Sequence, residues 1–353
     1  MSKFWSTFVQ DLEPYIPGEQ PQNSVKLKLN TNENPYPPCS EVKRVINENA
    51  FQKLNLYPDP ESIELKQDIA NYHKLDIENI FVGNGSDEIL AFIFYAFFKD
   101  KEDIFFPDIT YSFYPVYCKL FDIQFKEIPL LDSFEIDIKR FYSKNSGVIF
   151  PNPNAPTAIP LSKKTIEELI RQNEETIFVI DEAYVDFGTE SVINLVKQYK
   201  NIVVTRSFSK SRSMAGLRLG YAAADKNLIE ALNRIKNSFN SYPVDRIAQL
   251  AGSASIKDDV YFKKTCDAII KTRENFLYAL KEMGFRVFKS GANFVLIEPP
   301  KNLNAEFIFE SLRKDGIYLR YFKKPDRLIP FLRVTIGTDK QMEFLLEKIK
   351  KLI

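Results

Sequence analysis

Hydroxyl and cationic side chains gather between Thr205 and Arg218, directly after the short apolar run of residues 202–204. Consecutive β-branched residues are typical of a buried strand, so the polar side chains begin where that strand ends. Ser207, Ser209 and Arg218 can surround an anion such as a phosphate, because arginine presents a planar fork of hydrogen-bond donors. The pattern predicts an anion site at the end of a strand.

Lys210 lies within the same cluster. A lysine amine can form a Schiff base with an aldehyde when neighbouring cations and desolvation lower its pKa. A site that holds a phosphate and an electrophilic carbonyl together would explain why a lysine follows the hydroxyl groups. The alternative is a solvated basic loop after a strand, and this stretch alone leaves both interpretations open.

A carboxylate follows a second buried strand. Residues 177–180 form a continuous apolar run, as in a parallel strand buried on both faces, and Asp181 comes next. Open α/β sheets bind ligands at the carboxyl ends of such strands. Asp181 can keep a pyridine nitrogen protonated, as an aspartate does in pyridoxal phosphate enzymes, and Tyr184 can donate to the phenolic oxygen of that ring. Taken alone, Asp181 also suits a helix N-cap, but the nearby serine–lysine cluster favours the cofactor role.

A glycine turn joins a third strand to a helix within residues 78–90. Gly85 permits a close approach of the backbone, and Ser86 and Asp87 open the helix. Free N–H groups at the start of a helix bind phosphate, so these three residues are candidate phosphate contacts beside Arg218.

These segments resemble the histidinol-phosphate aminotransferases, a family of the fold type I, aspartate aminotransferase-like superfamily of pyridoxal phosphate enzymes. The resemblance extends from end to end of the chain. It includes LNTNENPYPP at residues 29–38, LYPDP at 56–60, VGNGSDEIL at 82–90, PNPNAPT at 151–157, SFSKSRSMAGLRLGY at 207–221 and LRVTIGT at 332–338. It implies an N-terminal arm at 1–28, a large α/β cofactor-binding domain with a mixed, mostly parallel sheet at 29–245, and a smaller α+β C-terminal domain at 246–353.

The resemblance assigns further contacts to the cofactor, pyridoxal 5′-phosphate. Lys210 holds the cofactor and then acts as the general acid–base. Tyr111 stacks on the ring, and Asn154 hydrogen-bonds the ring oxygen, with Asn152 as the second choice. The chain reads Asn-Ala-Pro-Thr-Ala here, whereas much of the superfamily has Asn-Pro-Thr-Gly. Tyr57 reaches the cofactor phosphate of the neighbouring subunit, which implies a homodimer with shared active sites.

Four further residues match substrate-binding positions of the family. Tyr15 in the arm lies near the substrate phosphate, and Asn32 belongs to a segment that closes over the substrate. Arg320 and Arg333 stand inside strands of the C-terminal domain; Arg333 takes the carboxylate of glutamate, and both serve the phosphate end of the substrate. An arginine in a strand is costly to bury without an anion. The alternatives are a hydrophobic anchor for Tyr15 and edge-strand arginines that face water.

Composition limits the remaining classes of protein. The 353 residues suffice for two domains, and 48 basic against 47 acidic side chains give no field that favours nucleic acid or a membrane. No apolar run approaches ~20 residues, and we expect no signal peptide. Three distant cysteines suit a reducing cytoplasm and indicate neither a disulfide framework nor a metal site. The single histidine, His73, is expected at the surface.

The resulting hypothesis is a ping-pong aminotransferase with small-molecule substrates. Glutamate leaves its amino group on the cofactor and becomes 2-oxoglutarate, and a phosphorylated keto substrate, imidazole acetol phosphate by resemblance, collects it. One alternative is another reaction on the same scaffold: decarboxylation of a phosphorylated hydroxy-amino acid, or transamination of a smaller phosphorylated or an aromatic substrate. The other is a regulator or binding module of this fold, against which Lys210 and the lack of an added DNA-binding domain argue.

Overall fold

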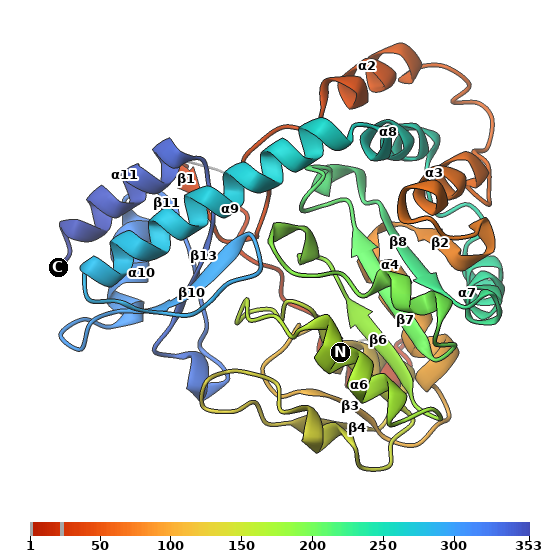
Figure 1. Ribbon diagram of the computed structural model, residues 1–353, viewed down its shortest axis with the longest axis horizontal. Coiled ribbons are helices and arrows are strands. Elements are labelled where there is room, and N and C mark those ends of the chain that lie inside the picture. The colour runs from red at the N-terminus through yellow and green to blue at the C-terminus, as the bar shows by residue number, and fades with distance from the viewer. Residues whose placement is uncertain (1–2, 22–24) are drawn as a thin grey trace.

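A computed structural model describes residues 3–21 and 25–353. Residues 1–2 and 22–24 of the expected N-terminal arm lie outside this described part. Figure 1 shows a larger and a smaller unit side by side, with the long helix α9 (Asp259–Glu282) running from one along the other.

The larger unit is built on a seven-stranded sheet. Its strands are β2 (Ile80–Gly83), β3 (Ile104–Pro107), β4 (Phe125–Ile128), β5 (Gly147–Pro151), β6 (Ile177–Asp181), β7 (Ile202–Ser207) and β8 (Gly220–Ala224). The spatial order is β2-β8-β7-β6-β5-β3-β4, and β8 runs antiparallel to both of its neighbours. The remaining pairs, from β7 to β4, are parallel. This arrangement confirms the predicted mixed, mostly parallel sheet.

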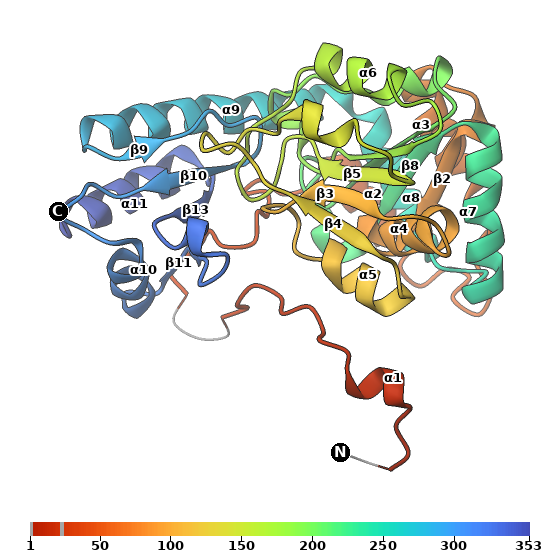
Figure 2. The same ribbon diagram turned by 90° about the horizontal axis from the view of Figure 1, so that it is seen from below.

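Two hydrophobic cores cover the two faces of this sheet. Along β6, Phe178 and Ile180 join one core while Val179 joins the other, because alternate side chains of a strand point to opposite faces. Helices α2 (Ser40–Asn49), α3 (Ile63–His73), α6 (Lys163–Arg171) and α8 (Arg246–Lys257) contribute to the first core; α4 (Gly85–Ile93), the π-helical turn Phe94–Phe98, α5 (Tyr114–Phe121) and α7 (Lys226–Phe239) contribute to the second. Figure 2 shows α6 and α5 on opposite sides of the strands.

The smaller unit has an antiparallel sheet of order β12-β13-β10-β9, made of β12 (Arg320–Tyr321), β13 (Leu332–Thr335), β10 (Phe294–Glu298) and β9 (Arg286–Val287). A separate core lies between this sheet and helices α9, α10 (Ala305–Lys314) and α11 (Asp339–Lys350). Beside it, β1 (Leu27–Lys28) pairs in parallel with β11 (Ile317–Tyr318). Short 3₁₀ helices complete the chain at Ile77–Asn79, Ile138–Phe141, Val185–Phe187, Ile193–Lys197, Ala215–Leu217 and Asp326–Leu328.

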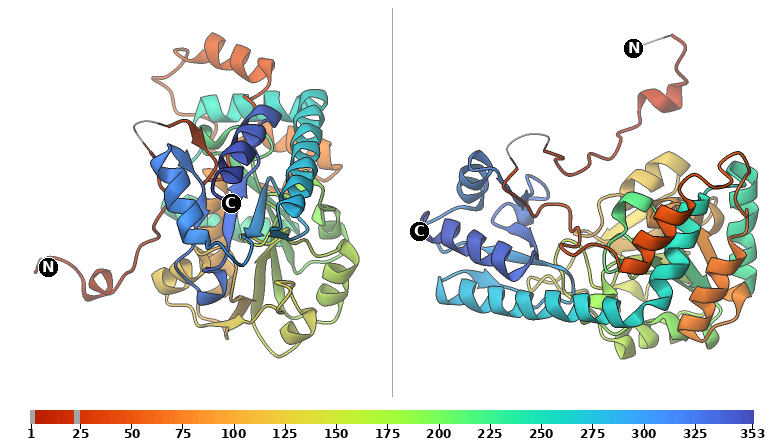
Figure 3. Two further views of the ribbon diagram at one scale, coloured as in Figure 1. Left: turned by 90° about the vertical axis from the view of Figure 1, so that its left-hand side faces the viewer. Right: turned by 90° about the horizontal axis from the view of Figure 1, so that it is seen from above.

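The N-terminal arm projects from the body of the molecule. Its helix α1 (Thr7–Gln10) buries no residue, and Figures 2 and 3 show it away from both units. The three-part division at residues 28 and 245 stays a prediction, and pairings of secondary-structure elements cross both boundaries. The arm supplies β1 to the smaller unit, and α8 packs against α2 and α3 of the larger one.

His73 is buried, and its predicted surface position is wrong. It lies on the inner face of α3 with Leu65 and Ile69, and its Nε2 is 2.7 Å from the Tyr221 hydroxyl. Burial lowers the pKa of the imidazole to about 3, so the ring is neutral at physiological pH. The helix is polar in overall composition, so the narrow apolar face on which the histidine lies was not recognised from the sequence.

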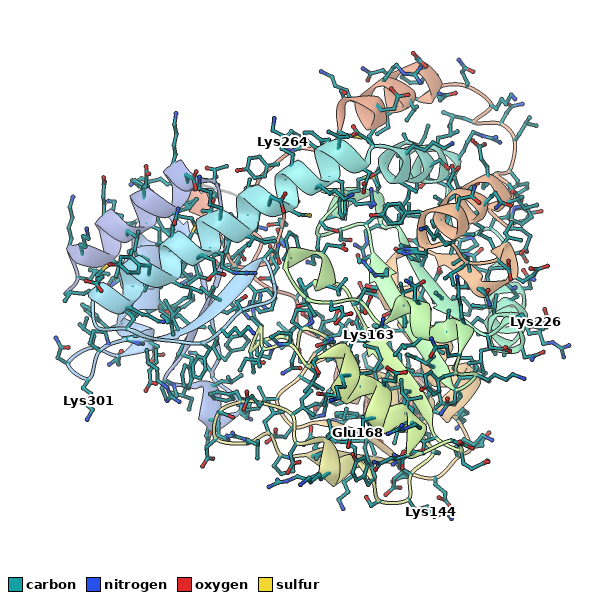
Figure 4. All side chains as sticks on the ribbon, viewed as in Figure 1. Lys144, Lys163, Glu168, Lys226, Lys264 and Lys301 are labelled. Carbon is teal, nitrogen blue, oxygen red and sulfur yellow. The ribbon has the colours of Figure 1, made fainter. Side chains whose placement is uncertain are left out.

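Charged side chains are spread over the outside of both units. Figure 4 shows Lys144, Lys226, Lys264 and Lys301 at separate places on the periphery, pointing away from the body. Within residues 3–21 and 25–353, no helix combines the length and the apolar character needed to span a bilayer.

Gly147 provides a test of packing in the larger unit. A Cβ at this position would lie 2.3 Å from Phe98 Cε1, inside the second core. We expect Gly147→Ala to lower the free energy of unfolding by about 1–3 kcal/mol, because the strand or the buried ring must shift. Urea denaturation measures this. The control is Gly216→Ala, whose added Cβ has no atom within 4 Å; equal urea midpoints for the two variants would contradict the packing described.

Candidate active site

A cavity of about 850 Å³ opens at the carboxyl ends of β3, β5, β6 and β7, between the two units. This is the edge where open α/β sheets bind ligands. Most of the candidate site residues predicted from the sequence line this cavity. Its wall includes Tyr15, Asn32, Ser86, Asp87, Tyr111, Asp181, Tyr184, Ser207, Ser209, Lys210, Arg218, Arg320 and Arg333. Gly85, Asn154 and Tyr57 are not part of the wall.

Asp181 is buried and accepts hydrogen bonds from three sides. Its Oδ1 accepts from the Thr205 hydroxyl at 3.1 Å and from the Ala183 N–H at 3.2 Å, and its Oδ2 accepts from the Tyr114 hydroxyl at 3.4 Å. No lysine or arginine of the described chain pairs with it, and burial raises the pKa of the carboxyl to about 6. A cationic nitrogen is the group that would compensate this carboxylate.

Lys210 lies three residues after the end of β7 and lines the cavity. Its Nζ donates to the Thr31 carbonyl at 3.2 Å and lies 5.6 Å from the centre of the Tyr184 ring. The backbone at Lys210 is fixed by Asn34, whose side-chain amide donates to the Lys210 carbonyl at 2.9 Å. The amine therefore points into the cavity with only a carbonyl as its hydrogen-bond partner among the described residues.

Ser86, Ser207, Ser209 and Arg218 together form the anion cup. Arg218 donates to the Ser209 hydroxyl at 3.4 Å, and Ser86 lies in the first turn of α4, where N–H groups are free. Gly85 stands behind the cup. Its φ is +79°, and a Cβ there would lie 2.7 Å from the Arg218 guanidinium. The positive φ favours glycine here, and a side chain would also displace the guanidinium from its present position.

Asp87 holds two other site residues in place. Its carboxylate pairs with Arg218 at 2.9 Å and accepts from the Tyr111 hydroxyl at 3.0 Å. A carboxylate repels a phosphate, so the predicted phosphate contact of Asp87 is left to its backbone N–H. The side chain instead orients the guanidinium and the aromatic ring.

Aromatic rings line the cavity beside the anion cup. Tyr111 packs edge-on against Tyr114 at 5.6 Å, which fixes the plane of its ring. Tyr15 from the arm stacks on Phe113 at 4.6 Å and lies 6.4 Å from Tyr111. Tyr114 is fully buried and donates a hydrogen bond to Asp181.

Asn32 and Tyr184 connect the two units. The Asn32 amide donates to the Tyr184 hydroxyl at 3.0 Å, and the Asn32 Oδ1 accepts from the Thr335 hydroxyl at 3.1 Å. The Thr335 hydroxyl also accepts from the Asn32 N–H at 3.0 Å. These bonds tie the segment after β1 to β13 and hold the tyrosine hydroxyl at the cavity.

The two asparagines predicted for the ring oxygen lie behind the wall. Asn154 is buried, and its amide donates to the Ile109 carbonyl at 2.9 Å and to the Thr157 hydroxyl at 3.0 Å. Asn152 exchanges both of its side-chain bonds with the backbone of Leu161. Both amides are thus engaged with the chain, and a contact between either of them and a ligand stays a prediction.

Tyr57 lies outside the cavity. It is 79% exposed and stacks on Tyr242 at 4.7 Å. Within the described residues Tyr57 makes no contact with the anion cup, and its predicted role in a neighbouring subunit stays a prediction.

Arg320 and Arg333 stand directly opposite each other on β12 and β13. Arg333 donates to the Asn30 carbonyl at 2.8 Å, and its Nε is screened from solvent with no hydrogen-bond partner among the described residues. Burial lowers the pKa of Arg333 to about 10, and the neighbouring Arg320 adds to this effect. No carboxylate of the described chain pairs with either arginine, so the arrangement calls for an anionic ligand.

Several functional contacts had no clear signal in the sequence. Thr205 lies opposite Asp181 in the register of β6 and β7, but a threonine at a strand end is common. Thr31 contributes a backbone carbonyl to Lys210, which no side-chain pattern reveals. The centre of the Phe322 ring lies 5.4 Å from the guanidinium carbon of Arg320 and 5.8 Å from that of Arg333. Only its position two residues after Arg320 could have indicated this role.

Known structures of this shape carry out more than one reaction. The histidinol-phosphate aminotransferase from Sinorhizobium meliloti, solved in complex with pyridoxal-5′-phosphate, superimposes with a TM-score of 0.87 at 22% identity, covering 100% of this chain and 99% of that one. The L-threonine-O-3-phosphate decarboxylase from Porphyromonas gingivalis superimposes with a TM-score of 0.80 at 23% identity, covering 92% and 99%. The fold is that of the fold type I pyridoxal phosphate enzymes.

Comparison with related sequences identifies the family within this fold to which the chain belongs. The model of the family Aminotransferase class I and II matches residues 24–349. A histidinol-phosphate aminotransferase from Acinetobacter baumannii (strain AB307-0294) is 51% identical over 353 residues, covering 99% of this chain and 97% of its own. The chain belongs to the aminotransferase class I and II family.

The cofactor of this class, pyridoxal 5′-phosphate, fits the residues of the cavity. Asp181 offers a buried carboxylate without a cation, the anion cup suits a phosphate, and Lys210 offers an amine for the carbonyl group. Tyr111 presents an aromatic ring to the same space.

Asp181→Asn should have opposite effects on rate and on stability. The turnover rate should fall roughly a hundredfold or more, because the ring nitrogen loses its counter-charge. In the cofactor-free protein the same change should raise the free energy of unfolding at pH 7.5 by roughly 3 kcal/mol, since a carboxyl with a pKa of about 6 instead of 3.8 resists ionising on folding.

The stability gain should depend on pH. The raised pKa means that ionisation of Asp181 costs stability above about pH 6, and that this cost shrinks as the pH falls toward 4. Urea denaturation of both cofactor-free proteins at pH 7.5 and pH 5 measures the difference. A gain that is equal at both pH values, or a near-native rate, would remove the role assigned to the carboxylate.

Proposed function

We propose that this chain is an aminotransferase that moves an amino group between glutamate/2-oxoglutarate and histidinol phosphate/imidazole acetol phosphate, a step of histidine biosynthesis. The observation that carries the proposal is the pair Arg320 and Arg333, two arginines at the cavity without an acidic partner in the described chain. The substrate named for the 51% identical relative supports the same choice.

Each of the main residues at the cavity has a separate role in the proposed reaction. Bound pyridoxal phosphate supplies an electron sink that stabilises negative charge on the substrate carbon. Asp181 would keep the ring nitrogen protonated, and the anion cup would hold the phosphate. Lys210 would hold the cofactor and would also serve as the general acid–base that moves a proton at the substrate carbon. The Tyr184 hydroxyl, which accepts a hydrogen bond from the Asn32 amide, would donate a hydrogen bond to the ring oxygen.

The two arginines suit both substrates of a ping-pong reaction in turn. Arg333 is placed for the carboxylate of glutamate, and both arginines for the phosphate of the second substrate. Each anion relieves the repulsion between two guanidiniums that face each other across β12 and β13. Tyr15 closes the same side of the cavity from the arm, so a phosphate there would also meet a phenol hydroxyl.

We further propose a homodimer with shared active sites. Tyr57 follows three exposed apolar side chains in the chain: Phe51 is 91%, Leu54 64% and Leu56 57% exposed. A second copy would cover this surface and receive Tyr57 at its own anion cup. The three free cysteines are buried, which agrees with the proposed cytoplasmic location.

Arg320→Ala tests the substrate. Loss of one charge-assisted contact should lower kcat/KM for histidinol phosphate roughly ten- to hundredfold, while glutamate is affected much less because Arg333 remains. Arg286→Ala is the matched control, since Arg286 lies on the edge strand of the same sheet and pairs with Glu298. Parallel losses for both substrates would place Arg320 in general site structure. Turnover of another phosphorylated amine, but not of histidinol phosphate, would keep the mechanism and replace the substrate.

Hybrid dimers test the shared site. Co-expression of Lys210→Ala with Tyr57→Ala chains should restore up to about a quarter of the normal activity, because one site of each mixed dimer has both residues intact. Each variant alone should be strongly impaired. A fully active monomer in sedimentation, or no recovery in purified mixed dimers, would contradict the shared site.

A further inference from the structure

A buried group of charged side chains lies directly behind the cavity wall, and no step of the proposed reaction uses it. Arg206 on β7 is at its centre. The Arg206 Nε lies 2.9 Å from Glu182 Oε2, and one of its terminal nitrogens donates to Asp186 Oδ1 at 2.6 Å. The Ser211 hydroxyl donates to the other Asp186 oxygen at 2.6 Å. We call Glu182, Asp186, Arg206 and Ser211 the rear network.

Charge compensation holds the rear network together. The Glu182 side chain is fully screened from solvent and that of Arg206 is 8% exposed. Burial raises the pKa of the Asp186 carboxyl, but the Arg206 guanidinium and the Ser211 hydroxyl outweigh burial, so its pKa lies below the ordinary value. One guanidinium thus serves two carboxylates at once, which requires the fork of an arginine.

Two members of the rear network are chain neighbours of the residues that act on the cofactor. Glu182 follows Asp181 directly, and Ser211 follows Lys210 directly. Arg206 bridges them from β7, the strand between these two points. The network therefore connects the carboxylate for the ring nitrogen to the lysine by a path outside the cavity.

We propose that Asp186 and Ser211 are positioning residues, which through Arg206 and Glu182 fix the placement of the Lys210 amine relative to the Asp181 carboxylate. This inference rests on the proposed function, because it concerns how Lys210 reaches the cofactor. Proton transfer between two carbons needs a closely defined amine position, and a misplacement of ~1 Å can cost roughly a hundredfold in rate.

Other contacts keep the lysine loop folded when the rear network is weakened. Asn34 donates to the Lys210 carbonyl from the opposite side. Arg212, the residue after Ser211, lies 4.1 Å from the centre of the Phe262 ring and hydrogen-bonds the Ser255 carbonyl. Ser211→Ala removes one hydroxyl and leaves the ion pair between Arg206 and Asp186, so it tests position more than folding.

The test compares the holoenzymes of Ser211→Ala, Ser211→Thr and a control, Ser213→Ala. The Ser213 side chain forms no hydrogen bond within the described chain and lies in the same loop. The readouts are the pH midpoint of the visible absorbance of the lysine-bound cofactor and the rate of the half-reaction with glutamate alone. We expect Ser211→Ala to move the midpoint and to slow the half-reaction roughly tenfold. Ser211→Thr should recover most of both, and Ser213→Ala should match the unmodified enzyme.

The outcomes separate this inference from the proposed function. An unchanged midpoint and rate in Ser211→Ala would overturn the positioning role, as would equal losses in Ser211→Ala and Ser211→Thr. If Ser211→Ala does not fold, Ser211→Cys replaces it, and its weak S–H donor predicts a smaller change in the same direction. Because the half-reaction is measured with glutamate as the sole substrate, its result does not depend on which phosphorylated substrate the enzyme uses. Unmodified protein that shows no cofactor on the Lys210 peptide after borohydride reduction would overturn the proposed function, and this inference with it.

Discussion

The carboxylate of Asp181 lies where an ionised group is costly, because it is buried and no cation of the described chain pairs with it. The register of β6 and β7 places Thr205 beside it, and Tyr114 and the Ala183 N–H supply two more donors. These three neutral donors recover only part of the lost hydration. The remaining cost makes this end of the cavity selective for a ligand with a positive charge.

The smaller unit carries the opposite imbalance. Arg320 and Arg333 face each other across two strands, and Phe322 gives them an apolar floor instead of a counter-ion. The molecule thus stores a negative charge in one unit and positive charges in the other, each without its partner. A cofactor with a cationic ring and a substrate with an anionic end would supply both missing charges.

The sequence allowed prediction wherever the chemistry is local to one strand and the turn after it. The apolar runs before Asp181 and Thr205 indicated buried strands, and the polar residues after them indicated the site. Contacts between distant segments were not predictable in this way. Lys210 donates its hydrogen bond to a backbone carbonyl, that of Thr31. The Asn154 side chain is engaged behind the cavity wall because its amide donates to the Ile109 carbonyl and the Thr157 hydroxyl. The continuous pattern of residues 317–321 does not indicate that the chain changes partners there, yet β11 pairs with β1 while β12 pairs with β13.

Leu27 and Lys28 find their partners, Ile317 and Tyr318, near the other end of the chain. A ribosome releases the first pair long before the second, so β1 has no partner during most of synthesis. The seven-stranded sheet, which ends at Ala224, can form in that interval, since all its strands have already emerged. The side of the cavity that carries Arg320 and Arg333 is therefore the last part to be assembled. A chain cut short before residue 317 would carry Lys210 and the anion cup, but Leu27 and Lys28 would have no strand to pair with.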